Sequence, residues 1–191
     1  MCECYRVPEP SSERVATAKR CVETGSDAAA EPSGLIDAVV DSTAAAPTDG
    51  GVGTLTVAFA IRRAVFVIEQ GVDSSLEWDD AETEATHLLL VVNERPIGTA
   101  RARLIDDSTV KAERVAVRRS ARGEGWGRRL MDAVEAVGVD ADASHCVLHA
   151  QQRVEGFYHT LGYQTVSEPF AEAGIPHVGM ERTLSTRSQH R

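Results

Sequence analysis

The sequence predicts an α+β fold in which a central mixed, mostly antiparallel sheet is flanked by helices. Two observations support this prediction. Three consecutive strand patterns, at 87–92, 97–105 and 110–117, are joined by short turns and indicate an antiparallel meander. The third strand then leads through a glycine-rich turn and an amphipathic helix to a strand at 146–149, which is a strand–helix–strand crossover.

Composition restricts the classes of protein to which this chain can belong. Its 191 residues suit one domain with additional chain, and 42% hydrophobic residues are enough for a packed core. The net charge of −9 argues against a general nucleic-acid-binding or membrane-surface protein. No apolar run is long enough to span a membrane, and the first residues lack a secretion-signal pattern. We therefore expect a cytoplasmic protein with no nucleic-acid and no membrane partner.

The cysteines and histidines do not indicate a metal site. Cys2 and Cys4 have no second pair at zinc-binding spacing, and no His, Cys and carboxylate residues follow the spacing of metal ligands. We therefore expect no metal cofactor.

Residues 1–53 differ in composition from the rest of the chain. They are rich in Ala, Ser, Thr, Asp, Glu, Pro and Gly, with one short apolar cluster at 35–40. Such a segment cannot bury enough apolar surface to offset its chain entropy, so we expect a disordered N-terminal extension. A functional peptide, or a start site assigned too far upstream, would have the same composition. The folded domain is expected at 54–185 and a frayed tail at 186–191.

Hydrophobic periodicity predicts the first elements of the domain. Residues 54–59 alternate and predict a strand, and an apolar stripe predicts a helix over 60–70, with Gly71 just after its end. The stripe consists of Ile61, Val65, Phe66 and Ile68. The loop that follows, 74–86, is acidic and contains Glu77, Trp78, Asp79, Asp80, Glu82 and Glu84.

The elements after the glycine-rich turn follow from the same reasoning. Leu130, Val134 and Val137 have the spacing of an amphipathic helix, which we expect to end at Gly138. The pattern then predicts a strand at 146–149 and a helix at 152–161 that is closed by Gly162. Two further strands are expected at 163–166 and 177–184, separated by a loop at 168–176.

The turn from Arg122 to Gly127 has the features of an anion site. Glycines at alternate positions allow positive φ angles and a close approach of a ligand to the backbone. The helix start adds N–H groups without partners and a partial positive charge, which suit phosphate. Arginines crowd the turn, at Arg118, Arg119, Arg122, Arg128 and Arg129. The structural alternative is a glycine-rich connection with solvated arginines.

Two common phosphate-binding motifs do not match this turn. No Gly-Lys-Ser/Thr follows the glycines, as a P-loop requires. Arg128 occupies the position of the last glycine in the dinucleotide fingerprint, so that interpretation is weak.

The residues from Arg122 to Gly127, after the Val-Ala-Val strand, resemble the Arg/Gln-x-x-Gly-x-Gly/Ala motif of the GNAT N-acetyltransferases. Residues 151–163 resemble the Asn-x-x-Ala-x-x-Phe-Tyr-x-x-x-Gly-Phe motif of that family, with Gln151 in place of Asn and Val154 in place of Ala. Further segments are similar to the ElaA-like subgroup, at 65–70, 87–89, 149–151 and 174–180.

The resemblance implies the GNAT fold and an N-acetyltransferase. Such an enzyme transfers the acetyl group of acetyl-CoA, its co-substrate, to an amine acceptor, which is a small molecule or a protein N-terminus or lysine. The turn would bind the pyrophosphate, while the preceding strand would pair with pantetheine and polarise the acetyl carbonyl. This assigns to acetyl-CoA the residues Val115, Ala116, Val117, Arg122, Gly123, Glu124, Gly125, Trp126, Gly127, Arg128 and Gln151.

The oligomeric state and the activity both stay open at this point. A homodimer is compatible with the resemblance. A catalytically silent acyl-CoA-binding or protein-interaction module on the same fold is the alternative function, because a fold does not determine an activity.

Two residues are candidates for proton transfer. Tyr158 lies at the family's general-acid position, and the resemblance implies that it donates a proton to the leaving thiolate; a core tyrosine is the alternative. By period-two alternation Glu113 shares a strand face with Val115 and Val117, which makes it a candidate general base; a solvated edge carboxylate is equally compatible.

Other charged residues have simpler interpretations. Carboxylates on the expected acceptor side would bind a cationic acceptor or form a solvated acidic loop, namely Glu69, Glu77, Asp79 and Asp80. His87 and His177 flank strands and are expected to be structural histidines.

Overall fold

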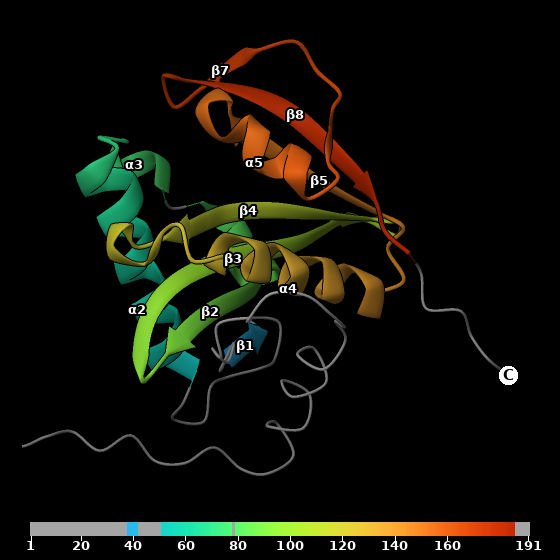
Figure 1. Ribbon diagram of the computed structural model, residues 1–191. Helices are drawn as coiled ribbons and strands as arrows, with labels where there is room; N and C mark the ends of the chain where they lie inside the picture. The colour runs from blue at the N-terminus through green and yellow to red at the C-terminus, as the bar shows by residue number, and fades with distance from the viewer. Residues whose placement is uncertain (1–37, 42–50, 78, 186–191) are drawn as a thin grey trace, which may run out of the picture.

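The computed structural model describes residues 38–41, 51–77 and 79–185, and its strands form one eight-stranded sheet (Figure 1). The order is β1-β2-β3-β4-β5-β8-β6, with β7 also paired to β8. Only the β4–β5 pair is parallel among the described strand pairs. The strands are β1 Ala38–Asp41, β2 Thr86–Val92, β3 Arg95–Asp106, β4 Thr109–Val117, β5 His145–Gln151, β6 Gln164–Thr165, β7 Phe170–Glu172 and β8 Ile175–Thr183. The predicted mixed, mostly antiparallel sheet is confirmed.

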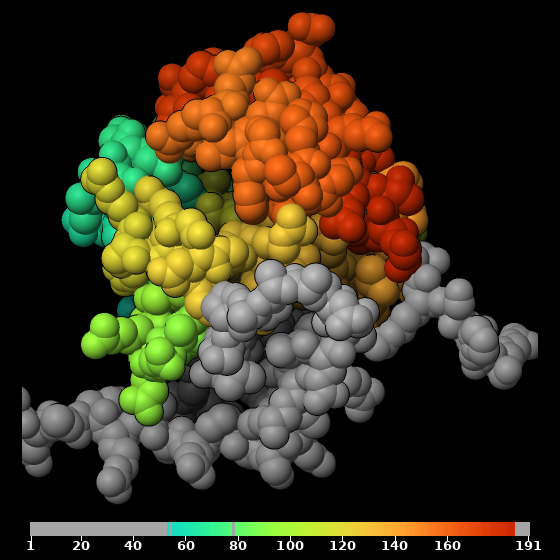
Figure 2. All heavy atoms as spheres, in the orientation of Figure 1, coloured from blue at the N-terminus to red at the C-terminus, as the bar shows by residue number. Residues whose placement is uncertain are grey.

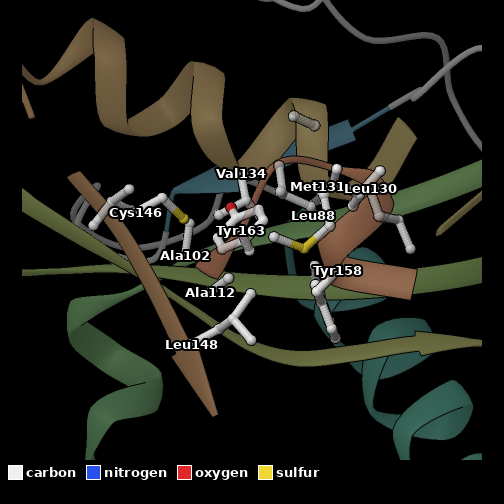
Figure 3. Packing of buried hydrophobic residues seen from close by; sticks show 14 of the residues in the cluster. Leu88, Ala102, Ala112, Leu130, Met131, Val134, Cys146, Leu148, Tyr158 and Tyr163 are labelled. Carbon is white, nitrogen blue, oxygen red and sulfur yellow. The ribbon is translucent and has the colours of Figure 1, made fainter. Parts of the chain in front are cut away.

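Helices cover both faces of this sheet. Leu88 and Leu90 of β2 belong to the apolar cluster under α4 (Trp126–Asp140), whereas Leu89 belongs to the cluster under α2 (Gly51–Arg62). Figure 3 shows part of the first cluster, with Met131 and Val134 of α4 among its labelled members. The other helical segments are the π-helix η1 Arg63–Glu69, α3 Ser74–Glu77, α5 Glu155–Thr160, and the 3-10 helices η2 Asp80–Glu84, η3 Arg119–Ala121 and η4 Gln152–Val154.

The first predicted strand is wrong, because residues 54–59 belong to α2. Ala58, Ile61 and Val65 are buried at helical spacing, so the apolar stripe begins inside the segment whose short alternation predicts a strand. The stripe also ends earlier than predicted, since Ile68 is 66% exposed. The π-helix η1 has more residues per turn than an α-helix, which rotates Ile68 away from the core.

The end of this helix agrees with the prediction. Gly71 has a φ of 74°, and its N–H donates to the carbonyl of Val67 at 3.1 Å. Glycine is favoured at this left-handed position because it has no Cβ.

The expected disordered extension differs from the structure in two places. Strand β1 pairs antiparallel with β2 at the edge of the sheet, and α2 begins at Gly51. β1 begins within the predicted apolar cluster at 35–40, and its backbone pairs with the edge of β2. Several predictions concern residues outside the described ranges. These are the disorder of the rest of 1–50, the frayed tail at 186–191, and the interpretations of Trp78 and of the first three cysteines.

α4 continues past its predicted end. Gly138 lies inside the helix and is buried, and a Cβ at this position would meet Cγ1 of Val110 at 2.4 Å. The glycine therefore permits close packing of α4 on β4, and the helix ends two residues later at Asp140.

The C-terminal region forms a hairpin where a loop is predicted. Residues 170–172 are strand β7, which pairs with the start of β8 through Phe170↔His177 and Glu172↔Ile175. Gly162 follows α5 with a φ of 90°, as predicted. None of the described helices has the length and apolar character needed to cross a membrane.

Candidate active site

The candidate site lies where β4 and β5 separate. The two strands pair only from Thr109↔His145 to Ala112↔Leu148, although β4 continues to Val117 and β5 to Gln151. Beyond the last pair the strands border a cavity of about 620 Å³. Figure 2 shows the surface hollowed between the region of α3 and the orange residues of α5. The edge of β4 that faces β5 is therefore open over 113–117 among the described strands.

A β-bulge in β4 sets the direction of its side chains at the cavity. β3 and β4 pair as Thr99↔Ala116 and then Arg101↔Glu113, so β4 has one extra residue, and Arg114 has a φ of 52°. Before the bulge, Val110 and Ala112 face the cluster under α4; after it, Val115 and Val117 do. Glu113 therefore lies on the opposite face from Val115 and Val117, and the prediction from simple alternation is wrong.

Glu113 is held by cations. Its carboxylate lies 2.9 Å from Arg101, 3.1 Å from Arg103 and 3.2 Å from Lys111. Burial opposes ionisation, but the hydrogen bond from Arg103 and the charges of Arg101 and Lys111 outweigh it and lower the pKa of Glu113 to about 2. So stable a carboxylate is a poor proton acceptor at neutral pH.

The acidic segment 74–86 folds against two buried arginines. Arg62 is 1% exposed; it pairs with Glu77 and lies 2.7 Å from Glu82. Arg101 is 2% exposed and lies 2.6 Å from Asp79. Glu77 and Glu82 neutralise buried charge, so the solvated-loop interpretation does not describe them. Asp79 pairs with Arg101 although its own side chain is 39% exposed. The exposed Asp80 and Glu84 do match the solvated interpretation.

The glycine-rich turn has the expected backbone. Gly123 and Gly125 have φ angles of 85° and 84°, and Gly125 is the N-cap of α4 with no capping side chain. A Cβ on Gly127 would meet Cζ of Phe157 at 3.1 Å, so this glycine permits the contact between α4 and α5. The first N–H groups of α4 therefore have no side-chain cap.

Side chains of the turn are engaged within the protein. Arg122 forms two contacts with Glu69, at 2.5 Å and 3.0 Å, and its Nε donates to the carbonyl of Val117 at 3.0 Å. Trp126 is 3% exposed and donates to Glu124 at 3.0 Å. Two further predicted phosphate-side arginines bind carbonyls, Arg118 that of Pro96 and Arg128 that of Thr160. Of these residues, Arg122 lines the cavity.

Tyr158 reaches the cavity from α5. Its side chain is 8% exposed, lines the cavity, and packs edge-on against Phe157 at a centroid distance of 5.0 Å. Burial raises the pKa of Tyr158 to about 12. The phenol is therefore protonated at neutral pH and has a hydrogen to donate.

Gln151 lies at the end of β5 and also lines the cavity. Its amide Nε2 donates to Oε1 of Gln70 at 2.9 Å, and its Oε1 accepts from Arg153 at 2.8 Å. Gln151 therefore links β5 to the end of the π-helix across the cavity.

The two histidines named from the sequence have different surroundings. His87 is buried, its Nε2 lies 3.1 Å from the carbonyl of Glu82, and burial lowers its pKa, as expected for a structural histidine. His177 is 8% exposed but lines the cavity, together with His149, which was not singled out as a site residue. Within the described ranges, no group of three His, Cys, Asp or Glu side chains could hold a metal ion.

Comparison with known proteins gives consistent matches. Residues 44–184 match the family described as acetyltransferase (GNAT) domain. YjcF of Bacillus subtilis, an uncharacterized N-acetyltransferase, is 40% identical over 124 residues, which is 64% of this chain and 88% of the relative. ElaA of Escherichia coli is 33% identical over 137 residues, 70% of this chain and 90% of the relative.

Solved structures show the same fold. The crystal structure of Escherichia coli ElaA aligns with a TM-score of 0.62 and 27% identity, covering 76% of this chain and 97% of ElaA. An aminoglycoside 6′-N-acetyltransferase complexed with coenzyme A aligns with a TM-score of 0.55 over 70% of this chain and 92% of that one. At 15% identity, this second likeness shows the fold alone.

Proposed function

This chain belongs to the GNAT acetyltransferase family, and from that premise we propose that it transfers an acetyl group from acetyl-CoA to a primary amine of a small molecule or a protein. The observation that carries the proposal is that one cavity borders the open edge of β4, Arg122 at the start of the glycine-rich turn, and Tyr158. The groups needed to bind acetyl-CoA and to donate a proton therefore line the same cavity. The coenzyme A bound by the aminoglycoside acetyltransferase supports the choice of co-substrate.

Acetyl-CoA is proposed to bind along β4 and the start of α4. The amides of pantetheine add to the open edge at Val115, Ala116 and Val117 as an extra strand. The backbone of the turn at 123–127 holds the pyrophosphate, because the start of the 15-residue α4 attracts negative charge. The positive φ angles at Gly123 and Gly125 leave this backbone open to a ligand.

Side chains around the turn have supporting roles in this proposal. Arg122 and Arg128 add positive charge, and Gln151 lies on the opposite wall. Glu124 and Trp126 contribute through their backbone, since their side chains bind each other. Arg122 would exchange Glu69 for phosphate when acetyl-CoA binds, because both are anions that suit a guanidinium.

The chemistry follows from these positions. A neutral amine attacks the acetyl carbonyl, whose developing negative charge is stabilised by backbone N–H groups of β4. The carbon–sulfur bond then breaks, and Tyr158 donates its hydrogen to the sulfur. A free thiol has a pKa of ~8.5, so its thiolate leaves more readily when such a donor protonates it.

Isotope-labelled acetyl-CoA tests this proposal. The protein is incubated with a metabolite extract and with a panel of pure amines, and products are analysed by mass spectrometry while thiol release is followed. Labelled amides with stoichiometric thiol release are expected. Acetyl-CoA binding without any labelled product would instead support the catalytically silent module.

A further inference from the structure

We propose that His149 is the general base that accepts a proton from the acceptor amine, and that Glu172 positions it. This inference rests on the proposed N-acetyl transfer and assigns the proton acceptor that the reaction needs. Both residues line the cavity, His149 from β5 and Glu172 from β7.

The contact between the two side chains determines which ring nitrogen is available. Nδ1 of His149 lies 2.7 Å from Oε2 of Glu172. An ionised carboxylate only accepts hydrogen bonds, so Nδ1 carries the ring hydrogen. Nε2 then keeps its lone pair and is the atom that can accept a proton.

The hairpin of β7 and β8 holds the imidazole in place. Phe170 packs edge-on against His149 at a centroid distance of 4.9 Å and stacks on His177 at 6.2 Å. Nδ1 of His177 donates to the carbonyl of Ile175 at 2.8 Å, which fixes the second ring. Pairing of His149 with Gly179 and of Phe170 with His177 places all three rings on one face of the sheet.

The other carboxylates of the cavity are less suited to this task. Glu77 is buried against Arg62, and Glu113 is bound by Arg101, Arg103 and Lys111. Among the described residues that line the cavity, Glu172 is the carboxylate whose ion pair is with a histidine. The His149–Glu172 pair therefore combines a free lone pair with access to the cavity.

Charged groups on neighbouring elements also face this histidine. They are Glu172 on β7, His177 and Glu181 on β8, Lys111 and Glu113 on β4, and Arg153 on η4. Lys111 pairs with Glu113 at 3.2 Å, and Glu181 lies 2.6 Å from His145. Glu172 is thus the charge in direct contact with the ring of His149.

The proton balance of the step is complete. Nε2 of His149 takes a proton from the amine nitrogen as the nitrogen–carbon bond forms. The carbon–sulfur bond breaks, and the sulfur receives the hydrogen of Tyr158. The proton on the imidazolium returns through solvent to Tyr158, so the net products are the amide and free coenzyme A.

β5 provides a matched control for the test. His145 lies four residues before His149 on the same strand face, is equally 40% exposed, and pairs with Glu181 at 2.6 Å, but it does not line the cavity. The experiment compares the wild-type chain with His149→Gln, Glu172→Gln and His145→Gln. It measures kcat/KM against pH with an amine acetylated by the wild type, and acetyl-CoA affinity by calorimetry.

His149→Gln is expected to lower kcat/KM by at least about tenfold and to remove the acidic limb of the pH profile, with unchanged acetyl-CoA affinity. Glu172→Gln is expected to lower kcat/KM with unchanged acetyl-CoA affinity, because the amide no longer fixes the hydrogen on Nδ1 of His149. His145→Gln is expected to change neither. A wild-type pH profile for His149→Gln, or an equal loss of kcat/KM for His145→Gln, would overturn the assignment of the base. Either result would leave the proposed N-acetyl transfer intact. If the wild type acetylates no amine, N-acetyl transfer itself fails, and the base assignment with it.

Discussion

Tyr158 and Tyr163 show how two similar residues serve different purposes. Their rings lie 5.9 Å apart at their centroids in the same core (Figure 3). Of the two, Tyr158 lines the cavity, whereas the hydroxyl of Tyr163 donates to Glu135 at 2.9 Å. The Tyr158 hydroxyl is therefore available for chemistry, and that of Tyr163 stabilises the core.

Replacing each hydroxyl separates these purposes. Tyr158→Phe is expected to lower kcat by at least about tenfold with near-normal acetyl-CoA affinity, since it removes a proton donor and little volume. Tyr163→Phe is expected to lower the melting temperature and to leave kcat nearly unchanged, because Glu135 loses a buried hydrogen bond. Steady-state kinetics and calorimetry measure both. A folded Tyr158→Phe protein with wild-type kcat would make Tyr158 a packing residue.

Glu113 is expected to make stability depend on pH. Its pKa is about 2 in the folded chain, below the ordinary value of 4.5, so the unfolded chain binds more protons between these values. The stabilisation is complete above the ordinary value and is lost as pH falls through about 2. Denaturation of wild type and Glu113→Gln should differ most at pH 7 and converge toward pH 2. An equal difference at every pH would show that Glu113 stabilises the fold without its charge.

Single-residue environments were the least predictable part of the sequence. Arg62 lies within an apolar helical stripe and Arg101 lies between Ala100 and Ala102, which together hint at buried cations paired with the acidic segment. The bulge at Arg114 has no comparable signal, because arginine is common in strands and rarely has a positive φ. That single extra residue reverses the face on which Glu113 lies.

At the scale of elements, the turn before α4 was predictable because its backbone requires glycines at positive φ angles.

Gly125→Val would place a β-branched residue at a φ of 84°, which costs about 1–3 kcal/mol, and would add a side chain at the proposed phosphate site. Acetyl-CoA affinity is expected to fall at least about tenfold. Gly162→Val, at a φ of 90° after α5, should impose similar strain and leave the affinity unchanged. Equal affinity losses, measured by calorimetry, would point to strain alone.

Other elements were predicted to the extent that local pattern determined them. The meander β2–β3–β4 and the crossover through α4 follow from short turns and clear periodicity. Residues 54–59 were too few to distinguish alternation from the start of a helical stripe. β7 was missed because its three residues depend on pairing with β8, which the sequence does not display. The missed hairpin supplies Glu172 and Phe170.

At the scale of the whole molecule, the separation of β4 from β5 gives the cavity two distinct sides. The glycine-rich turn and α5 border one side, and the acidic segment, His149 and the β7–β8 hairpin border the other. Acetyl-CoA and the amine would thus approach the open edge of β4 from different directions. The family and the fold were predictable from the sequence, but this division depends on where strand pairing stops.

The most direct test of this arrangement is amide hydrogen exchange with and without saturating acetyl-CoA. We expect slower exchange at Val115 and Val117 on β4 and at 123–127 in the turn, because these N–H groups would bind pantetheine and pyrophosphate. Buried amides at 88–90 on β2 serve as the control and should exchange at the same rate in both states. Bound acetyl-CoA with unchanged exchange at Val115, Val117 and 123–127 would contradict a site between β4 and β5.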